Sequence, residues 1–428
     1  MSPRDGDPQI ATIDRRLSRR QLLRGATIAA GASGAALLAG CAAPAAPHWT
    51  FGPNAGSSVA AAATATKAPA ASTAPDANSP APSSSPSTAP AKAVTVDEIS
   101  RHPSELPRSA DFALYRDGTY LGETRRTGAM NHEVHFTTRE VTAEVVPGTT
   151  MDYWTFDGRI PGPMIRGRVG DTVDFFLHNE PGSSMPHNVD FHAVTGPGGG
   201  SVSLDTLPGN ESELKVKLLH PGIFIYHCAF PDIPMHISHG MYGLVVVEPA
   251  DGLPSVEHEY YLMQSEFYTT LGAQQGHAEL HDKGQLSYSP ELGNEERPTF
   301  VVFNGRPDSI VGDRSLGTLD EAINTGEAVR LFVGNIGPNL VSSFHVIGEI
   351  FDTVYVEGSF ALENHSVQST VIPAGGATGV EFKVEVPGTY VIVDHSIFRT
   401  HKGALGTLTV AGPAAPDIYD PVKFDQIR

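Results

Sequence analysis

The sequence of 428 residues is poor in cysteine, because it contains only Cys41 and Cys228. Cys41 lies in the N-terminal segment, so Cys228 has no obvious disulfide partner. Positive charge is also scarce: 29 lysines and arginines stand against 48 acidic residues, which gives a net charge of −19. A surface of this sign argues against nucleic acid as a partner.

A long apolar run is missing from the N-terminal segment. The run from Ala26 to Leu38 is too short and too rich in glycine and alanine for a membrane span. It follows a twin-arginine pattern, SRRQLLR at 18–24, and ends in LAGC, which resembles the lipobox of bacterial lipoproteins. We expect residues 1–40 to be an export signal and Cys41 to become the lipidated first residue. Cleavage near Ala43 without a lipid is the alternative.

Apolar bulk is missing from residues 41–93, which consist almost wholly of alanine, proline, serine and threonine. Such a composition predicts a disordered linker. Fully extended at ~3.1 Å per residue, it would reach roughly 150 Å. We therefore expect a globular part held away from a membrane, in the periplasm or on the outer face of the cell membrane.

Long helical periodicities are scarce in the rest of the chain. Short runs rich in valine, isoleucine, phenylalanine and threonine are instead separated by glycine and proline, which predicts an all-β chain of antiparallel β-sandwich architecture. The clearest runs are Thr172–His178, Leu214–Leu218, Phe224–Tyr226, Leu244–Val247, Val329–Val333 and Tyr390–Val393.

An internal repeat divides this part of the chain. FDGR at 156–159 returns as FNGR at 303–306, PGIF at 221–224 returns as PGTY at 387–390, and GMYGLVVV at 240–247 returns as GALGTLTV at 403–410. Ordered repeats of this kind predict two homologous units. We expect two tandem domains at 94–250 and 251–412, followed by a C-terminal tail at 413–428.

The segment YHCAFPDIPMHISHGMYG at 226–243 places Cys228, His236 and Met241 close together after an apolar strand. A thiolate, an imidazole and a thioether are ligands that copper takes in electron-transfer centres. The motif PHNVDFH at 186–192 supplies His187 as the natural remaining ligand. These four residues predict a blue-copper site, which cycles one electron and has no open position for a substrate.

His192 and His227 remain for a second metal. Neighbouring side chains of a strand point to opposite sides, so His227 and Cys228 must face different ways. A metal bound by His192, His227 and one more histidine would keep an open position, which suits catalytic copper or zinc. Any one of these histidines taken alone would more simply be a hydrogen-bonded or surface residue.

The second copy of the repeat cannot form the first site. Asp394 stands where the first copy has Cys228, and Ala404 stands where it has Met241. The second copy nevertheless retains His345 and His395.

Four motifs together resemble the copper-containing nitrite reductases, two-domain cupredoxin enzymes that reduce nitrite to nitric oxide. They are PHNVDFH (186–192), YHCAFPDIPMHISHGMYG (226–243), SSFHVIGEIFD (342–352) and VDHSIFR (393–399). The resemblance covers about residues 95–412 and implies two tandem cupredoxin-like Greek-key domains. It implies one type 1 copper and one type 2 copper per subunit. The implied type 1 ligands are His187, Cys228, His236 and Met241; the implied type 2 ligands are His192, His227 and His395.

The resemblance also implies a mechanism. One electron enters at type 1 copper and passes through Cys228 and His227 to type 2 copper, where nitrite binds. Asp190 and His345 deliver the two protons through a bridging water, and Ile347 shapes the pocket. For Asp190, orienting a ligand imidazole is an alternative that is compatible with this role.

The family's type 2 site takes its third histidine from an adjacent subunit, so a homotrimer is implied. The electron donor is left open between a cupredoxin, a c-type cytochrome and a membrane-bound partner, as is a respiratory or a detoxifying role.

Competing interpretations explain less of the sequence. A laccase-like oxidase with a trinuclear copper cluster usually has His-x-His pairs, and this sequence contains none. A simple electron carrier with type 1 copper alone leaves His192, His227, His345 and His395 unexplained. A purely structural lipoprotein ignores every motif.

Overall fold

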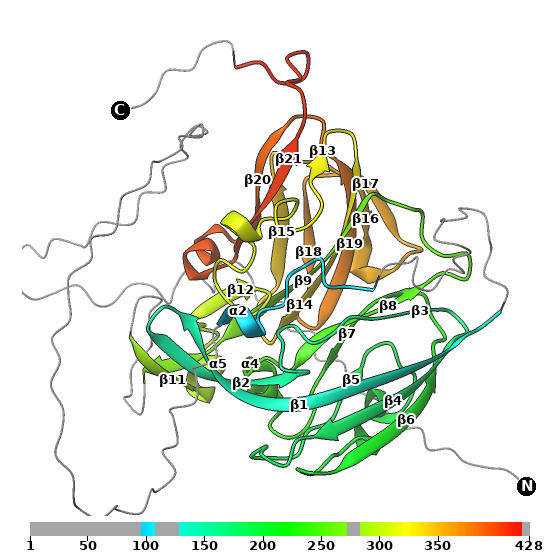
Figure 1. Cartoon of the computed structure of the whole chain (residues 1–428), viewed down its shortest axis with the longest axis vertical. Helices are drawn as coiled ribbons and strands as arrows, with labels where there is room; N and C mark the ends of the chain where they lie inside the picture. Colours follow the sequence, from blue (N-terminus) through cyan, green and yellow to red (C-terminus); the bar gives the residue numbers. More distant parts are fainter. Residues whose placement is uncertain (1–95, 108–127, 272–282, 422–428) are drawn as a thin grey trace, which may run out of the picture. The chain divides into compact units, whose positions relative to one another are not determined.

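The computed structural model describes residues 96–107, 128–271 and 283–421, and the regular secondary structure of this part of the chain is mostly β-strand (Figure 1). The predicted signal segment, the linker and Cys41 lie outside the described residues, and those predictions stay predictions. All six runs named above lie in strands, although Leu218 falls one residue beyond its strand. The all-β prediction is therefore confirmed.

Two sheets enclose the first core. The first sheet contains six strands in the spatial order β10 (Thr269–Leu271), β11 (Gly284–Tyr288), β2 (Thr149–Phe156), β1 (Asn131–Val146), β4 (Thr172–Asn179) and β6 (Glu211–Lys217). The second sheet contains β3 (Ile165–Arg168), β8 (Tyr242–Glu248), β7 (Gly222–His227) and β5 (Asp190–Phe191). Phe136 and Phe175 from the first sheet pack with Tyr226 and Val245 from the second. β10 and β11 follow residue 250 in the sequence, yet they join the first sheet. The predicted domain bounds stay predictions.

Two further sheets enclose the second core. The third sheet contains β12 (Phe300–Phe303), β9 (His258–Phe267), β14 (Ala328–Gly337), β19 (Gly376–Lys383), β16 (Phe351–Tyr355) and β17 (Glu363–Val367). The fourth contains β13 (Ile323–Asn324), β21 (Leu405–Ala411), β20 (Gly388–Asp394), β15 (Ser342–Ile347) and β18 (Ser369–Ile372). Leu331 and Val380 of the third sheet share a core with Phe344 and Ile392 of the fourth.

The second and third sheets pack against each other and are therefore buried on both faces. Leu244 on β8 and Tyr261 on β9 share one apolar cluster between the two sheets. The next residue of β8, Val245, faces the first core, and the next residue of β9, Leu262, faces the second core. A strand buried on both faces reads as a continuous apolar run rather than an alternating one. This explains the uninterrupted sequence LVVV in β8.

The pairing is not antiparallel throughout. β1 pairs in parallel with β4, and β9 pairs in parallel with β14 at the corresponding place in the second half. β3 pairs in parallel with β8 in the first half, and β13 pairs in parallel with β21 at the corresponding place in the second half. Non-consecutive strands meet in each couple, so the chain can return in the same direction. The shared exceptions show that the sequence repeat is also a structural repeat.

Helical segments are short. In the described ranges the α-helices are α2 (Val96–Ile99), α4 (Ile233–Ser238) and α5 (Pro290–Asn294), and the 3₁₀ turns are η1 (Pro197–Ser203), η2 (Gly312–Arg314), η3 (Val356–Gly358) and η4 (Ile397–Lys402). Among the described residues, no helix has both the length and the apolar character needed to cross a membrane.

Candidate metal centres

The first candidate centre lies where loops leave the second sheet. His187 precedes β5, Cys228 directly follows β7, His236 lies in α4, and Met241 directly precedes β8. Backbone hydrogen bonds close the loop on itself, because the Cys228 N–H donates to the Met241 carbonyl (3.1 Å) and the Met241 N–H donates to that of His236 (3.3 Å). The four predicted type 1 residues are fully buried.

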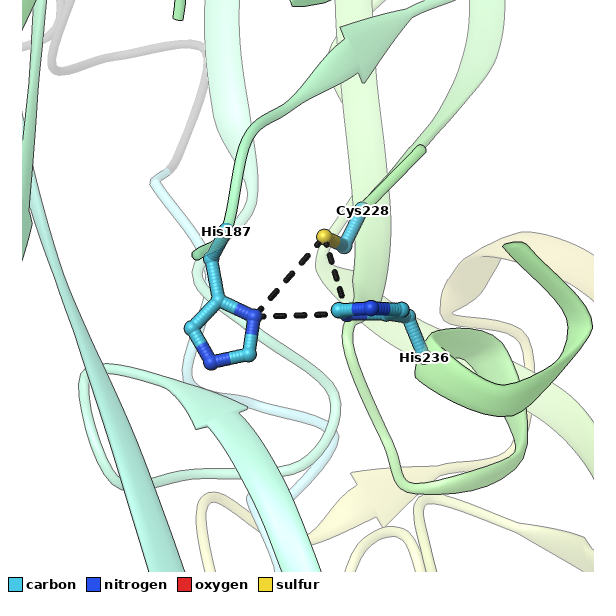
Figure 2. Close-up of side chains that lie close together, drawn as sticks. All are labelled: His187, Cys228 and His236. Atoms are coloured by element: carbon cyan, nitrogen blue, oxygen red, sulfur yellow. Dashed lines mark hydrogen bonds between the residues drawn. The ribbon is translucent and has the colours of Figure 1, made fainter. Parts of the chain in front are cut away.

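Three of these side chains point toward one another (Figure 2). The Cys228 Sγ atom lies 3.2 Å from His236 Nδ1 and 3.9 Å from His187 Nδ1, and the two Nδ1 atoms are 3.3 Å apart. Nitrogen and sulfur ligands at about 2.0–2.3 Å in a near-tetrahedral arrangement would be separated by roughly 3.3–3.6 Å. The spacing therefore fits one shared metal ion.

Burial sets the electrostatics of this centre. It raises the pKa of the Cys228 thiol to about 12. Burial, and then the neighbouring His187, lowers the pKa of His236 to about 3. The protein alone thus favours a neutral thiol and a neutral imidazole here. A bound cation reverses the preference of the thiol, since a coordinating thiol loses its proton.

Asn188 supports the sulfur and was not singled out from the sequence. Its backbone N–H points at Cys228 Sγ from 3.4 Å, and its side-chain oxygen accepts from the Ala229 N–H at 2.8 Å. Its amide nitrogen donates to Asp205 at 2.7 Å, which fixes the orientation of the side chain. The only signal for this role in the sequence was its position next to His187.

Trp154 covers the two imidazoles of the first centre. Its ring lies edge-on to His236 and His187, with centroids 4.9 and 5.6 Å away, and stacks on His239 at 4.1 Å. His239 in turn donates from Nδ1 to the Met235 carbonyl (2.7 Å). Sequence reasoning missed Trp154 because it lies on a distant strand, β2.

The second candidate centre lies on the opposite side of the end of β7, where His227 is the last residue of the strand. His192 Nε2 and His227 Nε2 are 3.3 Å apart, and a carboxylate oxygen of Asp190 lies within 4.8 Å of both. His227 Nδ1 is 3.0 Å from the Cys228 carbonyl, which can only accept, so Nδ1 carries the proton. His227 therefore presents an unprotonated Nε2, as a metal-binding histidine must.

Gly199 allows Asp190 to lie against the backbone. A Cβ atom at position 199 would stand 1.9 Å from the Asp190 Oδ1 atom and 2.8 Å from the Phe191 carbonyl oxygen. The backbone φ of Gly199, +54°, is also one that favours glycine. Gly199, the second of three consecutive glycines in η1, thus makes room for this carboxylate.

The histidines of the second half form a separate pair. His345 on β15 and His395, just after β20, have ring centroids 5.5 Å apart, and His395 is exposed. Within the described ranges, neither belongs to the group formed by Asp190, His192 and His227. Ile347, on the same strand as His345, is 43% exposed.

The strand register shows which residues correspond in the two halves. His345 lies opposite Val393, one residue before Asp394, just as Asp190 lies opposite His227, one residue before Cys228. His345 is therefore the counterpart of Asp190 rather than of His192, and the two predicted proton carriers occupy equivalent places in the two halves.

Comparisons with known proteins agree with this picture. Residues 137–252 match the multicopper oxidase family. The copper-containing nitrite reductase of Neisseria gonorrhoeae is 49% identical over 326 residues, which cover 76% of this chain and 76% of that protein. That of Pseudomonas chlororaphis is 33% identical over 64% of this chain and 77% of its own. The solved copper nitrite reductase of Nitrosomonas europaea superposes with a TM-score of 0.56 and 31% identity, over 67% of this chain and 96% of its own.

The fold and the two donor sets define a copper protein built from cupredoxin-like β-sandwiches. Within that class, the chain belongs to the copper-containing nitrite reductase family. Family membership gives its enzyme class, an oxidoreductase, and its cofactor, copper.

Proposed function

We propose that this protein reduces nitrite to nitric oxide and water, consuming one electron and two protons. The observation that carries the proposal is the pair of donor groups on either side of one peptide unit, with Cys228 in the first and His227 in the second. His187, His236 and Met241 complete the type 1 ligands, and His192 and His395 complete the type 2 ligands.

Consecutive residues supply the electron path. Cys228 and His227 share a peptide bond, and His227 Nδ1 bonds to the Cys228 carbonyl, so a short covalent and hydrogen-bonded route joins the two centres. Copper held by these residues would supply the one-electron redox chemistry and would polarise the nitrite oxygens. The burial of the first donor group would keep substrate away from it, whereas the second donor group, with His192 exposed, would be open to nitrite.

Asp190 and His345 are the proposed proton carriers. Asp190 lies beside both imidazoles of the second centre. His345 Nδ1 contacts the Gln368 carbonyl and so carries a proton, which leaves Nε2 to exchange one with substrate. General acids of this kind must come within hydrogen-bond reach of the departing oxygen. Ile347, exposed beside His345, would form a wall of the nitrite pocket.

A homotrimer would complete the type 2 site with His395 of an adjacent subunit. Two features support this arrangement. His192 and His395 are both exposed in the single chain. Apolar residues are exposed as well on the segments that follow His345 and His395 in the sequence, Ile350 (61%) and Phe398 (79%), and on β18, which pairs with the strand of His345, Val371 (64%). Exposed apolar surface of this kind marks an interaction site.

The proposed location is extracytoplasmic, by the twin-arginine route and with a lipid on Cys41. The proposed electron donor is a cupredoxin or a c-type cytochrome, and the acidic net charge favours a basic or neutral one.

Metal analysis and electron paramagnetic resonance test the two-centre assignment. We expect two distinct cupric signals per subunit, of type 1 and type 2. A single type 1 signal in fully copper-loaded protein would instead identify an electron carrier.

A further inference from the structure

The second half of the chain retains the backbone frame of the first metal centre. Asp394 follows Pro387 by seven residues, as Cys228 follows Pro221. The Ser343 N–H donates to Asp394 Oδ1 at 3.1 Å, just as the Asn188 N–H points at Cys228 Sγ. Asp394 therefore occupies the place of the copper-binding sulfur.

Arg399 occupies the place of His236. It precedes Gly403 by four residues, as His236 precedes Gly240. The hydrogen bond that follows is also preserved, because the Ala404 N–H donates to the Arg399 carbonyl at 3.1 Å, and the Met241 N–H donates to the His236 carbonyl at 3.3 Å. In this second frame, an ion pair between Arg399 Nη1 and Asp394 Oδ2 (2.5 Å) stands where the first half has ligands to a metal.

The Asp394 carboxylate is fully buried and receives four hydrogen bonds. Oδ1 accepts from the backbone N–H groups of Ser343 (3.1 Å) and Ser396 (3.0 Å). Oδ2 accepts from Gln264 Nε2 (2.9 Å) and from Arg399. A buried charge with this many hydrogen-bond donors is well compensated. Removal of the cationic partner would leave the buried carboxylate without a compensating charge, which is strongly unfavourable.

These bonds enclose His395. The contact from Asp394 to Ser396 spans two residues and makes His395 the middle residue of an Asx-turn. The His395 N–H itself donates to the Ser343 carbonyl at 2.6 Å. Arg399 also connects this turn to the residue before β15, since its Nη1 donates to the Val341 carbonyl at 2.6 Å. The backbone of His395 is thus fixed although its side chain is exposed.

We infer that Asp394 and Arg399 form a positioning pair that holds His395 in place for the type 2 metal, in a degenerate copy of the type 1 site. This inference rests on the proposed role of His395 as a type 2 ligand. The pair acts through His395 and contacts neither the substrate nor the metal. The first half uses its frame to bind a metal, and the second half uses the same frame to orient a ligand for another.

Arg399→Met and Arg399→Lys test the pair. One nitrogen, Nη1, makes both contacts, so a lysine ammonium can restore them, whereas methionine has similar length and no donor. Loss of an orienting partner weakens metal binding by roughly 10–100-fold. We expect Arg399→Met to lose type 2 copper on dialysis and to show an altered type 2 resonance, with the type 1 colour intact. Arg399→Lys should restore both.

Arg168→Met is the matched control. Arg168 Nε forms a 2.8 Å ion pair with the buried Glu248 in the first half of the chain. The substitution also removes an arginine from a buried carboxylate, although Glu248 keeps Arg166 as a second partner, and it lies on β3, at neither candidate centre. We expect it to lower the thermal midpoint while type 2 copper occupancy and the resonance stay as in the parent protein.

The outcomes separate this inference from the proposed function. If His395→Ala loses type 2 copper but Arg399→Met keeps it with an unchanged resonance, the positioning role is wrong and the ligand assignment survives. If His395→Ala itself keeps type 2 copper, the ligand assignment fails first. Should Arg399→Met not accumulate as folded protein, Arg399→Gln replaces it. The glutamine amide is uncharged and too short to make both contacts of Nη1, so the same loss of type 2 copper is expected, and retained copper would contradict the inference in the same way.

Discussion

Cys228 is the residue whose chemistry depends most on a metal. Burial raises the pKa of its thiol to about 12, so the thiolate does not form on its own at neutral pH. The nearby His236 and His187 Nδ1 atoms offer the geometry in which a cation would stabilise that thiolate. The colour and electron storage of the protein should therefore rest on this one side chain.

We expect Cys228→Ala to abolish the visible colour while the type 2 copper is retained, because only the first donor group contains sulfur. Optical spectra and metal analysis of the purified variant check this. His178→Ala, at a histidine of β4 outside both candidate centres, is the control and should keep both metals. Colour that persists in Cys228→Ala would show that the type 1 ligand assignment is wrong.

Asp190→Asn separates proton delivery from orientation of a ligand. An amide keeps the size of the carboxylate but cannot act as a general acid, a role that contributes about 10²–10⁴-fold. We expect turnover of nitrite to fall by that factor with type 2 copper content unchanged, as measured by steady-state kinetics and metal analysis. Loss of the copper in this variant would favour the orienting role alone.

At the scale of elements, the second and third sheets are joined by buried ion pairs. Glu259 on β9 accepts from Arg166 on β3 (2.8 and 3.0 Å) and from Arg330 on β14 (2.7 Å). Arg166 also pairs with Glu248 at 2.8 Å, and both of these side chains are fully buried. Burial opposes the charge of Glu259, but the guanidinium of Arg166, followed by that of Arg330, holds its pKa below the usual range.

Glu259→Gln should lower the free energy of unfolding by about 3–5 kcal/mol, because it removes the negative charge between two buried guanidinium groups and leaves each with one carboxylate partner, Glu248 for Arg166 and Glu381 for Arg330. Urea unfolding measures the change. Glu180→Gln breaks the exposed pair with Arg139 and should cost only about 0–1 kcal/mol. A Glu259 variant that is as stable as the control would contradict the role of this network.

The same carboxylate predicts a pH dependence. Since the pKa of Glu259 is lowered in the folded state, its stabilising contribution is present above the unfolded-state pKa and is lost as the pH falls through the folded-state pKa. The stability difference between the parent protein and Glu259→Gln should therefore shrink on acidification. Unfolding curves recorded from neutral to acidic pH would show it, and a gap that widens would contradict it.

Much of this level of structure could be predicted from the sequence, for local reasons. Runs such as Thr172–His178 and Phe224–Tyr226 carry strand propensity within themselves, and the ligand motif around Cys228 is contiguous. The parallel pairing of β1 with β4, the place of Trp154 over the imidazoles and the Arg166–Glu259 contact could not, since they join residues far apart in the chain. The sequence repeat aligned Asp394 with Cys228, but the ion pair between Asp394 and Arg399 could be found only from the fold.

At the scale of the whole molecule, the proposed type 2 site is incomplete in one chain. The described residues bring His192 and His227 together and keep His395 outside that group. The proposed trimer places His395 of one subunit beside the other two histidines of its neighbour. This predicts that two inactive variants can repair each other.

His192→Ala and His395→Ala should each lack nitrite turnover when purified alone. After the two are unfolded and refolded together, or expressed together, mixed trimers should contain interfaces with a full set of ligands. We therefore expect activity to return in the mixture, with each variant refolded alone as the control. No recovery in mixtures that are demonstrably mixed would place all the ligands on one chain.

The most direct measurement is the release of nitric oxide from nitrite by copper-loaded protein supplied with electrons by a reduced dye. The account predicts one nitric oxide for each electron consumed, together with loss of that activity and retention of colour in His395→Ala. Copper-loaded protein that shows both cupric signals, accepts electrons from the dye and releases no nitric oxide would contradict it.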